Sequence, residues 1–259
     1  MSTAPNGTFT PAPGAAPFAS QVRAQAAMET RLLLRNGEQL LIAVAIPVIV
    51  LIGGVLASRH LDLKLTSRAV DVLTPGVLAL AVMSTAFTSL AIATGFERRY
   101  GLLKRLGSSP LPRSGLLAGK VGALLVVEVL QGIVISVVGF SLGWRPDPVG
   151  FLVIVPVALL GTAAFASLGL LLAGTLRAEA TLAAANLVYL LLMAGGAVVL
   201  PRSSYGGFGA VQAILPSGAL GDATRAAFLT GQVDMRALLV LLVWAMVGAA
   251  LATRFFRWE

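Results

Sequence analysis

Long uncharged stretches dominate the hydrophobic pattern of this chain, and six of them follow one another between residues 40 and 253. Only one of these stretches contains a charged residue, Glu128. A helix of about 20 apolar residues, rising about 1.5 Å per residue, crosses a hydrocarbon core of about 30 Å. The pattern therefore predicts an all-α, polytopic membrane protein with six transmembrane helices, at residues 40–57, 72–96, 121–144, 149–176, 181–200 and 237–253.

The N-terminal part differs from the stretches that follow it. Residues 1–19 are rich in Pro, Ala, Gly and Thr and contain no charged side chain, a composition that predicts a disordered tail because it cannot bury a core. Residues 20–38 combine arginines with apolar side chains, which is typical of an amphipathic helix at a membrane surface. We expect this interfacial helix to lead into a membrane domain over residues 39–259.

The positive charges indicate which way the predicted spans point. Most of the 19 Lys and Arg fall on the side that holds both ends of the chain and the 97–120 loop. Because cytoplasmic loops carry an excess of Lys and Arg, both termini are predicted to be cytoplasmic. The net charge of +8 thus reports orientation and predicts no nucleic-acid partner, while a composition rich in Ala, Gly and Arg but poor in Lys favours a bacterial cell membrane.

The long loop between the fifth and sixth spans, at 201–236, is only partly polar. Its pattern predicts two short apolar helices, over 208–215 and 219–229, broken by Pro216 and Gly218. Such re-entrant pieces occur at membrane depth where they pack against protein. Asp222 and Arg225 are spaced to pair on one face of the second helix.

Composition excludes several kinds of chemistry. The chain is 57% hydrophobic and 12% charged, against about 25% charged residues in soluble domains. It has no cysteine and one histidine, which excludes thiolate sites, a cysteine nucleophile and a histidine metal cluster. Residues 115–120 approach a phosphate-binding loop, but the spacing is one residue short and Val121 replaces the required Ser or Thr. We therefore expect no enzyme activity, cofactor or metal site in this chain.

The most informative polar segment is GFERRYGLLKRLGSSPLPRSGLLAGK, residues 95–120. It predicts a short charged helix over 97–106 that breaks at 107–110, with cations on one side and leucines on the other. From the residues alone, such a helix is either a docking element for a partner or an anchor that touches only lipid headgroups.

This segment also carries a family resemblance. Its pattern E-R-R-x-G-L-L-K-R-L-x-x-x-P-L, followed by G-K at the next span, resembles the cytoplasmic loop of ABC type-2 exporter permeases. The entry into the first span, LRNGEQLLIAVAIPV, and the segment LPSGALGDATRAAFLTG before the last span are also similar to that family. The resemblance covers most of the chain from about residue 21 to its end.

The resemblance implies a partner and a mechanism. In that family the loop after the second span forms a coupling helix that docks on a separate ABC ATPase subunit, with the connecting helix, here 20–38, beside it. The working transporter would contain two ATPase subunits, which bind the ATP and Mg²⁺, and two permeases, which are identical copies or sister chains. It would move a hydrophobic or amphipathic substrate outward from the membrane by alternating access. A drug-like molecule, as in antibiotic export, or a lipid is favoured. The implied docking residues are Glu97, Arg98, Arg99, Gly101, Leu102, Lys104, Arg105 and Leu106.

Polar residues inside the predicted spans form a second candidate set. An ionised carboxylate such as Glu128 costs a few kcal/mol at membrane depth, so we expect it to be neutral, paired or facing a cavity. Gln131 lies close enough along the chain to share its site. These groups either line a pathway or fix helix packing, and an ion-coupled secondary transporter using Glu128 and a non-transporting scaffold stay open as alternatives. The candidate pathway or interface residues are Glu128, Gln131, Ser84, Thr88, Asn186 and Tyr189.

Overall fold

The computed structural model describes residues 16–58, 60, 67–107 and 112–256. These residues are helical and contain no β-strand, so the predicted all-α class is confirmed for the described part of the chain. The elements in chain order are α1 (Phe18–Arg35), α2 (Gly37–Ala57), α3 (Ala69–Met83), the π-helical segment η1 (Ser84–Ser89), α4 (Leu90–Arg99), α5 (Leu102–Gly107), α6 (Arg113–Ser141), α7 (Gly150–Thr175), α8 (Ala178–Gly195), the 3₁₀ segment η2 (Arg202–Phe208), α9 (Gly209–Gln212), α10 (Pro216–Thr230) and α11 (Met235–Phe255).

Five helices in the described part of the chain are long and apolar enough to cross a membrane: Ala69–Arg99, Ser114–Ser141, Gly150–Thr175, Ala178–Gly195 and Met235–Phe255. The first of them combines α3, η1 and α4. The remaining predicted span, 40–57, coincides with α2, whose described apolar part, Ala43–Ala57, is shorter than a full crossing requires. A count of six spans therefore stays a prediction.

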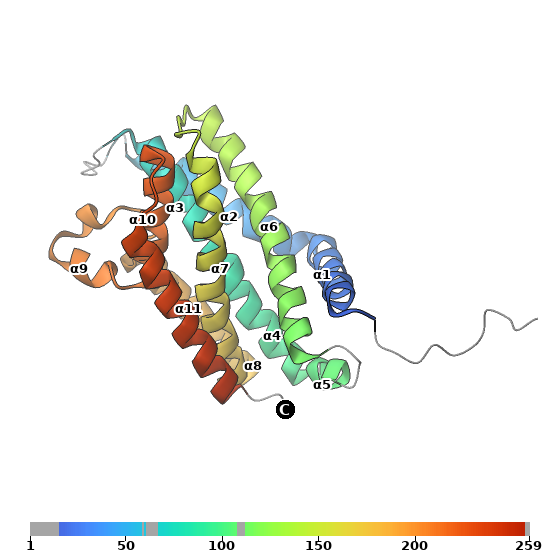
Figure 1. Cartoon of the computed structure of the whole chain (residues 1–259). Coiled ribbons are helices and arrows are strands. Elements are labelled where there is room, and N and C mark those ends of the chain that lie inside the picture. The colour runs from blue at the N-terminus through green and yellow to red at the C-terminus, as the bar shows by residue number, and fades with distance from the viewer. Residues whose placement is uncertain (1–15, 59, 61–66, 108–111, 257–259) are drawn as a thin grey trace, which may run out of the picture.

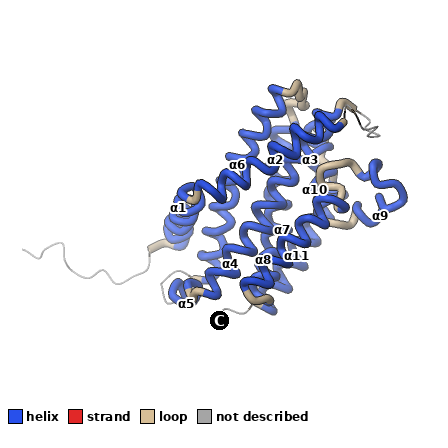
Figure 2. Tube along the Cα trace, turned by 180° about the vertical axis from the view of Figure 1, so that it is seen from behind, coloured by secondary structure: helices blue, strands red, loops and turns tan. Residues whose placement is uncertain are grey.

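The helices form one bundle with α5 at its lower end and α9 projecting from its side in Figure 1. Helices α7 and α11 pack against one another, and α1 lies against α6, as both views show (Figures 1 and 2). Helix α10 is surrounded by α3, α7 and α11. The bundle therefore places the start of α6, the end of α4 and the N-terminal helix together near the end that holds α5 (Figure 2).

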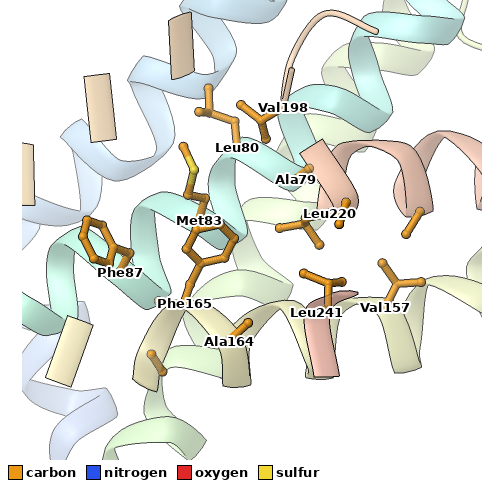
Figure 3. Close-up of a cluster of buried hydrophobic side chains, with 14 of the residues drawn as sticks. Ala79, Leu80, Met83, Phe87, Val157, Ala164, Phe165, Val198, Leu220 and Leu241 are labelled. Atoms are coloured by element: carbon orange, nitrogen blue, oxygen red, sulfur yellow. The ribbon is translucent and has the colours of Figure 1, made fainter. Parts of the chain in front are cut away.

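The centre of the bundle is an apolar cluster to which most of the long helices contribute, among them α3, α7, α10 and α11 (Figure 3). Phe165 of α7 lies among Leu80 and Met83 of α3, Leu220 of α10 and Leu241 of α11, all fully buried. Small residues permit the close approach of the helices that carry these side chains. At Gly161 of α7, for example, an added Cβ would stand 2.7 Å from the Leu220 side chain.

The segment between α8 and α11 differs from its prediction. Pro216 does not break a helix but begins α10, and Gly218 lies inside that helix. Proline suits a first helical turn because the N–H that it lacks has no helical partner there. Glycine is required at 218 because a Cβ would stand 2.0 Å from the carbonyl oxygen of Gln212. Both residues therefore support α10, and it is preceded by η2 and the short α9.

Arg225 of α10 provides hydrogen-bond donors for the backbone carbonyl groups that follow α8. Its guanidinium donates to the carbonyl oxygens of Ala197 at 2.9 Å, Val198 at 3.0 Å and Val199 at 3.3 Å. It also donates to Asp222 at 3.1 Å, which confirms the pair predicted from the sequence. Non-helical backbone is tolerated inside a membrane domain only when its polar groups find such partners.

The N-terminal helix α1 packs on α6 through small residues. A Cβ added at Gly119 of α6 would stand 2.5 Å from Cγ and 2.8 Å from Cβ of Gln25, which is buried on α1. A Cβ at Gly122 would contact Ala26 at 3.3 Å. These glycines let α1 lie directly on α6, while the leucines Leu32 and Leu34 of α1 remain exposed.

A matched pair of glycine substitutions on α6 tests this contact. Gly119→Ala is expected to destabilise the protein by about 1–3 kcal/mol, because the added methyl group overpacks the interface with α1. Gly132→Ala meets no heavy atom within 4 Å and is expected to be neutral or to stabilise α6 by up to about 1 kcal/mol. Thermal unfolding in detergent should place the midpoint of Gly119→Ala below that of the native protein and the midpoint of Gly132→Ala at or above it. Equal midpoints for the two variants would contradict the contact.

Candidate functional site

The segment predicted as one helix over 97–106 is two helices in the structure. Helix α4 ends at Arg99, Gly101 adopts a positive φ of 68°, and α5 begins at Leu102. The left-handed conformation of Gly101 ends α4 because it cannot continue a right-handed helix, and glycine adopts it without steric cost. The prediction of a single helix was therefore wrong, and Gly101 acts at the bend between α4 and α5.

A buried lysine joins three helices just before this bend. The ammonium of Lys120 on α6 donates to Glu97 of α4 at 2.6 Å and to Glu29 of α1 at 3.0 Å. Gln25 of α1 donates to the same oxygen of Glu29 at 2.9 Å. Lys120 is only 5% exposed, so its charge depends on these two carboxylates for compensation. We refer to Lys120, Glu29, Glu97 and Gln25 as the Lys120 cluster.

Two arginines connect the end of α4 to the other side of the bundle. Arg98 donates to the carbonyl oxygen of Gly174 at 2.7 Å and to that of Leu176, at the end of α7. Arg99 forms an ion pair with Glu179 in the first turn of α8. A cation at a helix C-terminus bonds the last carbonyls and suits the helix dipole. Glu97, Arg98 and Arg99 thus fix the end of α4 to α1, α6, α7 and α8.

The predicted docking residues consequently divide into two groups. Glu97 and Arg98 are engaged in contacts within the chain, whereas Leu102 and Lys104 of α5 are exposed. Tyr100, at the bend, is 70% exposed and was missed by the sequence reasoning, although an aromatic residue in a charged segment is itself a signal. We call Tyr100, Leu102 and Lys104 the exposed docking face. The side chains of Arg105 and Leu106, also predicted, lie outside the described part of the structure.

The structure separates the two polar candidates of α6. Glu128 accepts a hydrogen bond from Thr162 of α7 at 2.6 Å. Gln131 instead accepts from Thr85 of η1 at 2.9 Å and donates to the carbonyl oxygen of Ala43 on α2, also at 2.9 Å. The two residues, which are close enough along the chain to share a site, do not share one, because their side chains bond to different neighbouring helices. Gln131 fixes helix packing.

The other polar candidates are spread over η1 and α8. The hydroxyl of Tyr189 lies beside that of Ser84, which links α8 to η1. The hydroxyl of Thr88 is buried without a hydrogen-bond partner among the described residues. Asn186 is exposed on α8, together with Leu187 and Leu190. The six candidates therefore do not converge on one site.

Glu128 lies on an apolar cavity of about 650 Å³. The cavity is bounded by α3, α6, α7 and α10, and runs from the middle of α6 toward its C-terminal end. We call it the Glu128 groove; its lining includes Val82, Glu128, Gly132, Ser136, Phe140, Phe151, Ile154, Thr224 and Phe228. A cavity of this size falls in the range of small-molecule sites.

The long apolar helices define a multi-pass helical membrane protein. The family model of the ABC-2 type transporter matches residues 20–229, which is most of the chain. The chain therefore belongs to this family and is an ABC transporter permease, the component that transports across the membrane and generally partners with an ABC ATPase subunit. Neither the curated proteins nor the solved structures provided a match to the chain.

Proposed function

We propose that this chain is the membrane subunit of an ATP-driven exporter in a bacterial cell membrane. Both termini and α5 then face the cytoplasm, and a separate ABC ATPase subunit docks on α5. ATP and Mg²⁺ are bound by that partner, and this chain performs no hydrolysis itself. A hydrophobic or amphipathic substrate, drug-like or lipid, leaves through alternating inward and outward access.

The observation that carries the proposal is the set of contacts that hold the end of α4, directly before α5. The residues just before α5 are attached to α1, α6, α7 and α8, whereas the side chains of the exposed docking face lie at the surface, with Tyr100 stacked on Phe96 of α4. A displacement of α5 by a partner would act on these contacts, because the end of α4 is bonded to α6, α7 and α8 and, through Lys120, to α1. An anchor that only touched lipid headgroups would not need these attachments.

The exposed surface of α8 supports the pairing of permeases. Asn186, Leu187, Leu190 and Leu191 are all exposed on this helix, and an amide in an apolar helix gains from a partner that satisfies it. We propose that α8 contributes to the contact with a second copy or a sister permease. The alternative of an ion-coupled transporter gains no support, because Glu128 is the one ionisable side chain among the described residues that line its groove. The family match favours a transporter over a scaffold.

The docking face is tested by comparing two exposed leucines. Leu102→Asp is expected to abolish co-purification of the ABC ATPase from solubilised native membranes, because a carboxylate replaces an apolar contact at the centre of the face. Leu34→Asp on α1 makes the same change at a residue of the same exposure, 43% against 42%, and is expected to retain the ATPase. The ATPase is identified by peptides that contain its phosphate-binding loop.

Glu97→Arg is unsuitable for this test because it would also break the Lys120 cluster. If native protein and Leu34→Asp both elute as single species without any ATPase, the exporter function is refuted. If Leu102→Asp retains the ATPase as well as the native chain does, the docking face lies elsewhere.

A further inference from the structure

Two buried carboxyl oxygens among the described residues have no hydrogen-bond partner, Oε2 of Glu97 and Oε1 of Glu128, and of these two residues only Glu128 lines the apolar groove. Glu128 is 8% exposed, and its Oε2 accepts the hydrogen bond from Thr162. Its Oε1 is buried and has no hydrogen-bond partner among the residues that the structure describes. A buried polar atom of this kind is rare in native proteins, because losing its hydrogen bond to water costs free energy. It therefore calls for a partner that the chain does not itself supply.

The partner would have to enter through the Glu128 groove. Glu128 lies 15 residues from the start of α6 and 13 from its end, so it stands near the middle of this span. The rims of the groove are apolar side chains that are more than half exposed, Val129 at 62% on α6 and Val155 at 54% on α7. Exposed valines in the middle of membrane helices face lipid, so the groove is reached from the bilayer rather than from water.

The lining decides which kind of molecule fits. Apart from Glu128, the groove is lined by aliphatic and aromatic side chains, together with Gly132 and Ser136 on α6 and Thr224 on α10. A long or planar apolar body is therefore favoured. Glu128, at the end of the groove nearest the middle of α6, is the single acidic acceptor. Its carboxyl group is already removed from water in the folded protein. A positively charged donor is the group that gains most from this acceptor, because a hydrogen bond between charged partners is about twice as strong as a neutral one.

We propose that the Glu128 groove binds a cationic amphiphile, a hydrophobic molecule with a protonated amine that donates to the carboxyl group of Glu128. Its apolar part lies between α6 and α7, against Gly132 and Ser136, and extends toward Phe140 and Phe151. Thr162 is a positioning residue, since its hydrogen bond to Oε2 holds the carboxyl group of Glu128 beside the groove. This proposal names a substrate class for the export function, so the ligand is an export substrate only if that proposed function holds. The binding itself requires no ATPase.

Trp144 supplies a reporter for this site. Its ring lies 5.1 Å from the rings of Phe140 and Phe228 and 6.3 Å from that of Phe151, measured between centroids, and these three rings line the groove. The chain has three tryptophans, so Trp244→Phe with Trp258→Phe leaves Trp144 as the only one. A bromine atom at the far end of a bound alkyl chain would quench its fluorescence on close approach.

The experiment compares two probes that differ only in the head group. The full-length single-tryptophan protein is reconstituted into phosphatidylcholine vesicles and titrated with 12-bromododecylamine or 12-bromododecanol, at equal concentrations in the bilayer. The amine is expected to reach half-maximal quenching at a concentration lower by about tenfold or more, as a charge-assisted hydrogen bond predicts. Glu128→Gln keeps an acceptor for Thr162 and is expected to reduce the amine to the level of the alcohol.

Two further variants keep the proposal falsifiable if Glu128→Gln folds poorly. Gly132→Leu fills the groove and is expected to weaken quenching by both probes, since a Cβ at this position meets no other atom. Ser167→Ala, a buried hydroxyl of α7 outside the groove, is expected to change neither probe. Equal quenching by amine and alcohol in the single-tryptophan protein would overturn the proposal in favour of a neutral lipid. No quenching by either probe would indicate that protein, such as a second copy, covers the groove.

The two proposals fail separately. Loss of the amine preference leaves ATPase co-purification unaffected, and an absent ATPase leaves the binding measurement intact.

Discussion

Lys120→Met is expected to destabilise the junction of α1, α4 and α6 by about 3–5 kcal/mol, because it leaves two largely buried carboxylates without their cation. Lys120 is the only side chain that contacts both Glu29 and Glu97 among the described residues. The expected result is a clear fall in the midpoint of thermal unfolding in detergent. Loss of the partner ATPase should accompany it, because α5 follows directly on α4.

Lys104→Met provides the matched control, since Lys104 is exposed on α5 and carries the same charge. It is expected to leave the unfolding midpoint near that of the native chain. Adding Glu29→Gln and Glu97→Gln to Lys120→Met should restore much of the stability, because the penalty comes from uncompensated charge rather than from lost volume. A triple variant no more stable than Lys120→Met would show that packing, not charge, holds the cluster together.

Arg225→Leu is expected to have an effect of similar size at the opposite end of the bundle. Three carbonyl oxygens after α8 and the carboxylate of Asp222 lose the buried donor that serves them all. Each unsatisfied buried group costs about 1–3 kcal/mol, so the total is expected to exceed about 3 kcal/mol. Thermal unfolding measures the loss, and amide exchange should accelerate at residues 196–200.

Arg236→Leu removes the same side chain from an exposed position and is expected to change stability little. Arg225→Lys should fall between the two, because one ammonium keeps the charge beside Asp222 but lacks the fork that reaches several carbonyls. If Arg225→Leu unfolds at the same temperature as Arg236→Leu, then the segment after α8 does not depend on this guanidinium.

The helical class of the chain could be predicted because membrane helices are recognised in a sequence by their length and apolar composition alone. The bend at Gly101 could not, since a glycine in a charged helical pattern is compatible with either continuation or termination. Pro216 was misjudged for a related reason: proline marks a helix boundary, but the pattern does not say on which side the helix lies. Local sequence therefore locates such boundaries without deciding their geometry.

The contacts of the candidate site residues were harder to predict from the sequence, because they join residues that are far apart along the chain. Glu128 and Gln131 lie within one turn of α6, yet their partners Thr162 and Thr85 are 34 and 46 residues away and belong to different helices. The same holds for Glu97, whose partner Lys120 is 23 residues further on. The resemblance pointed to one segment for docking, but only the fold distinguishes residues of this segment that hold α4 from residues that face outward.

The π-helical segment η1 also has a consequence for how this span should be compared with others. A wider turn adds a residue to the helix, and one extra residue rotates everything beyond it by about 100° relative to a regular α-helix. Helix α3, before η1, packs mainly against α2, α6 and α10, whereas α4, after it, packs against α7 and α8; α7 also contacts α3. A single span therefore serves two sets of neighbours. An alignment that treats 69–99 as one uninterrupted helix would assign residues on one side of Ser84–Ser89 to the wrong face.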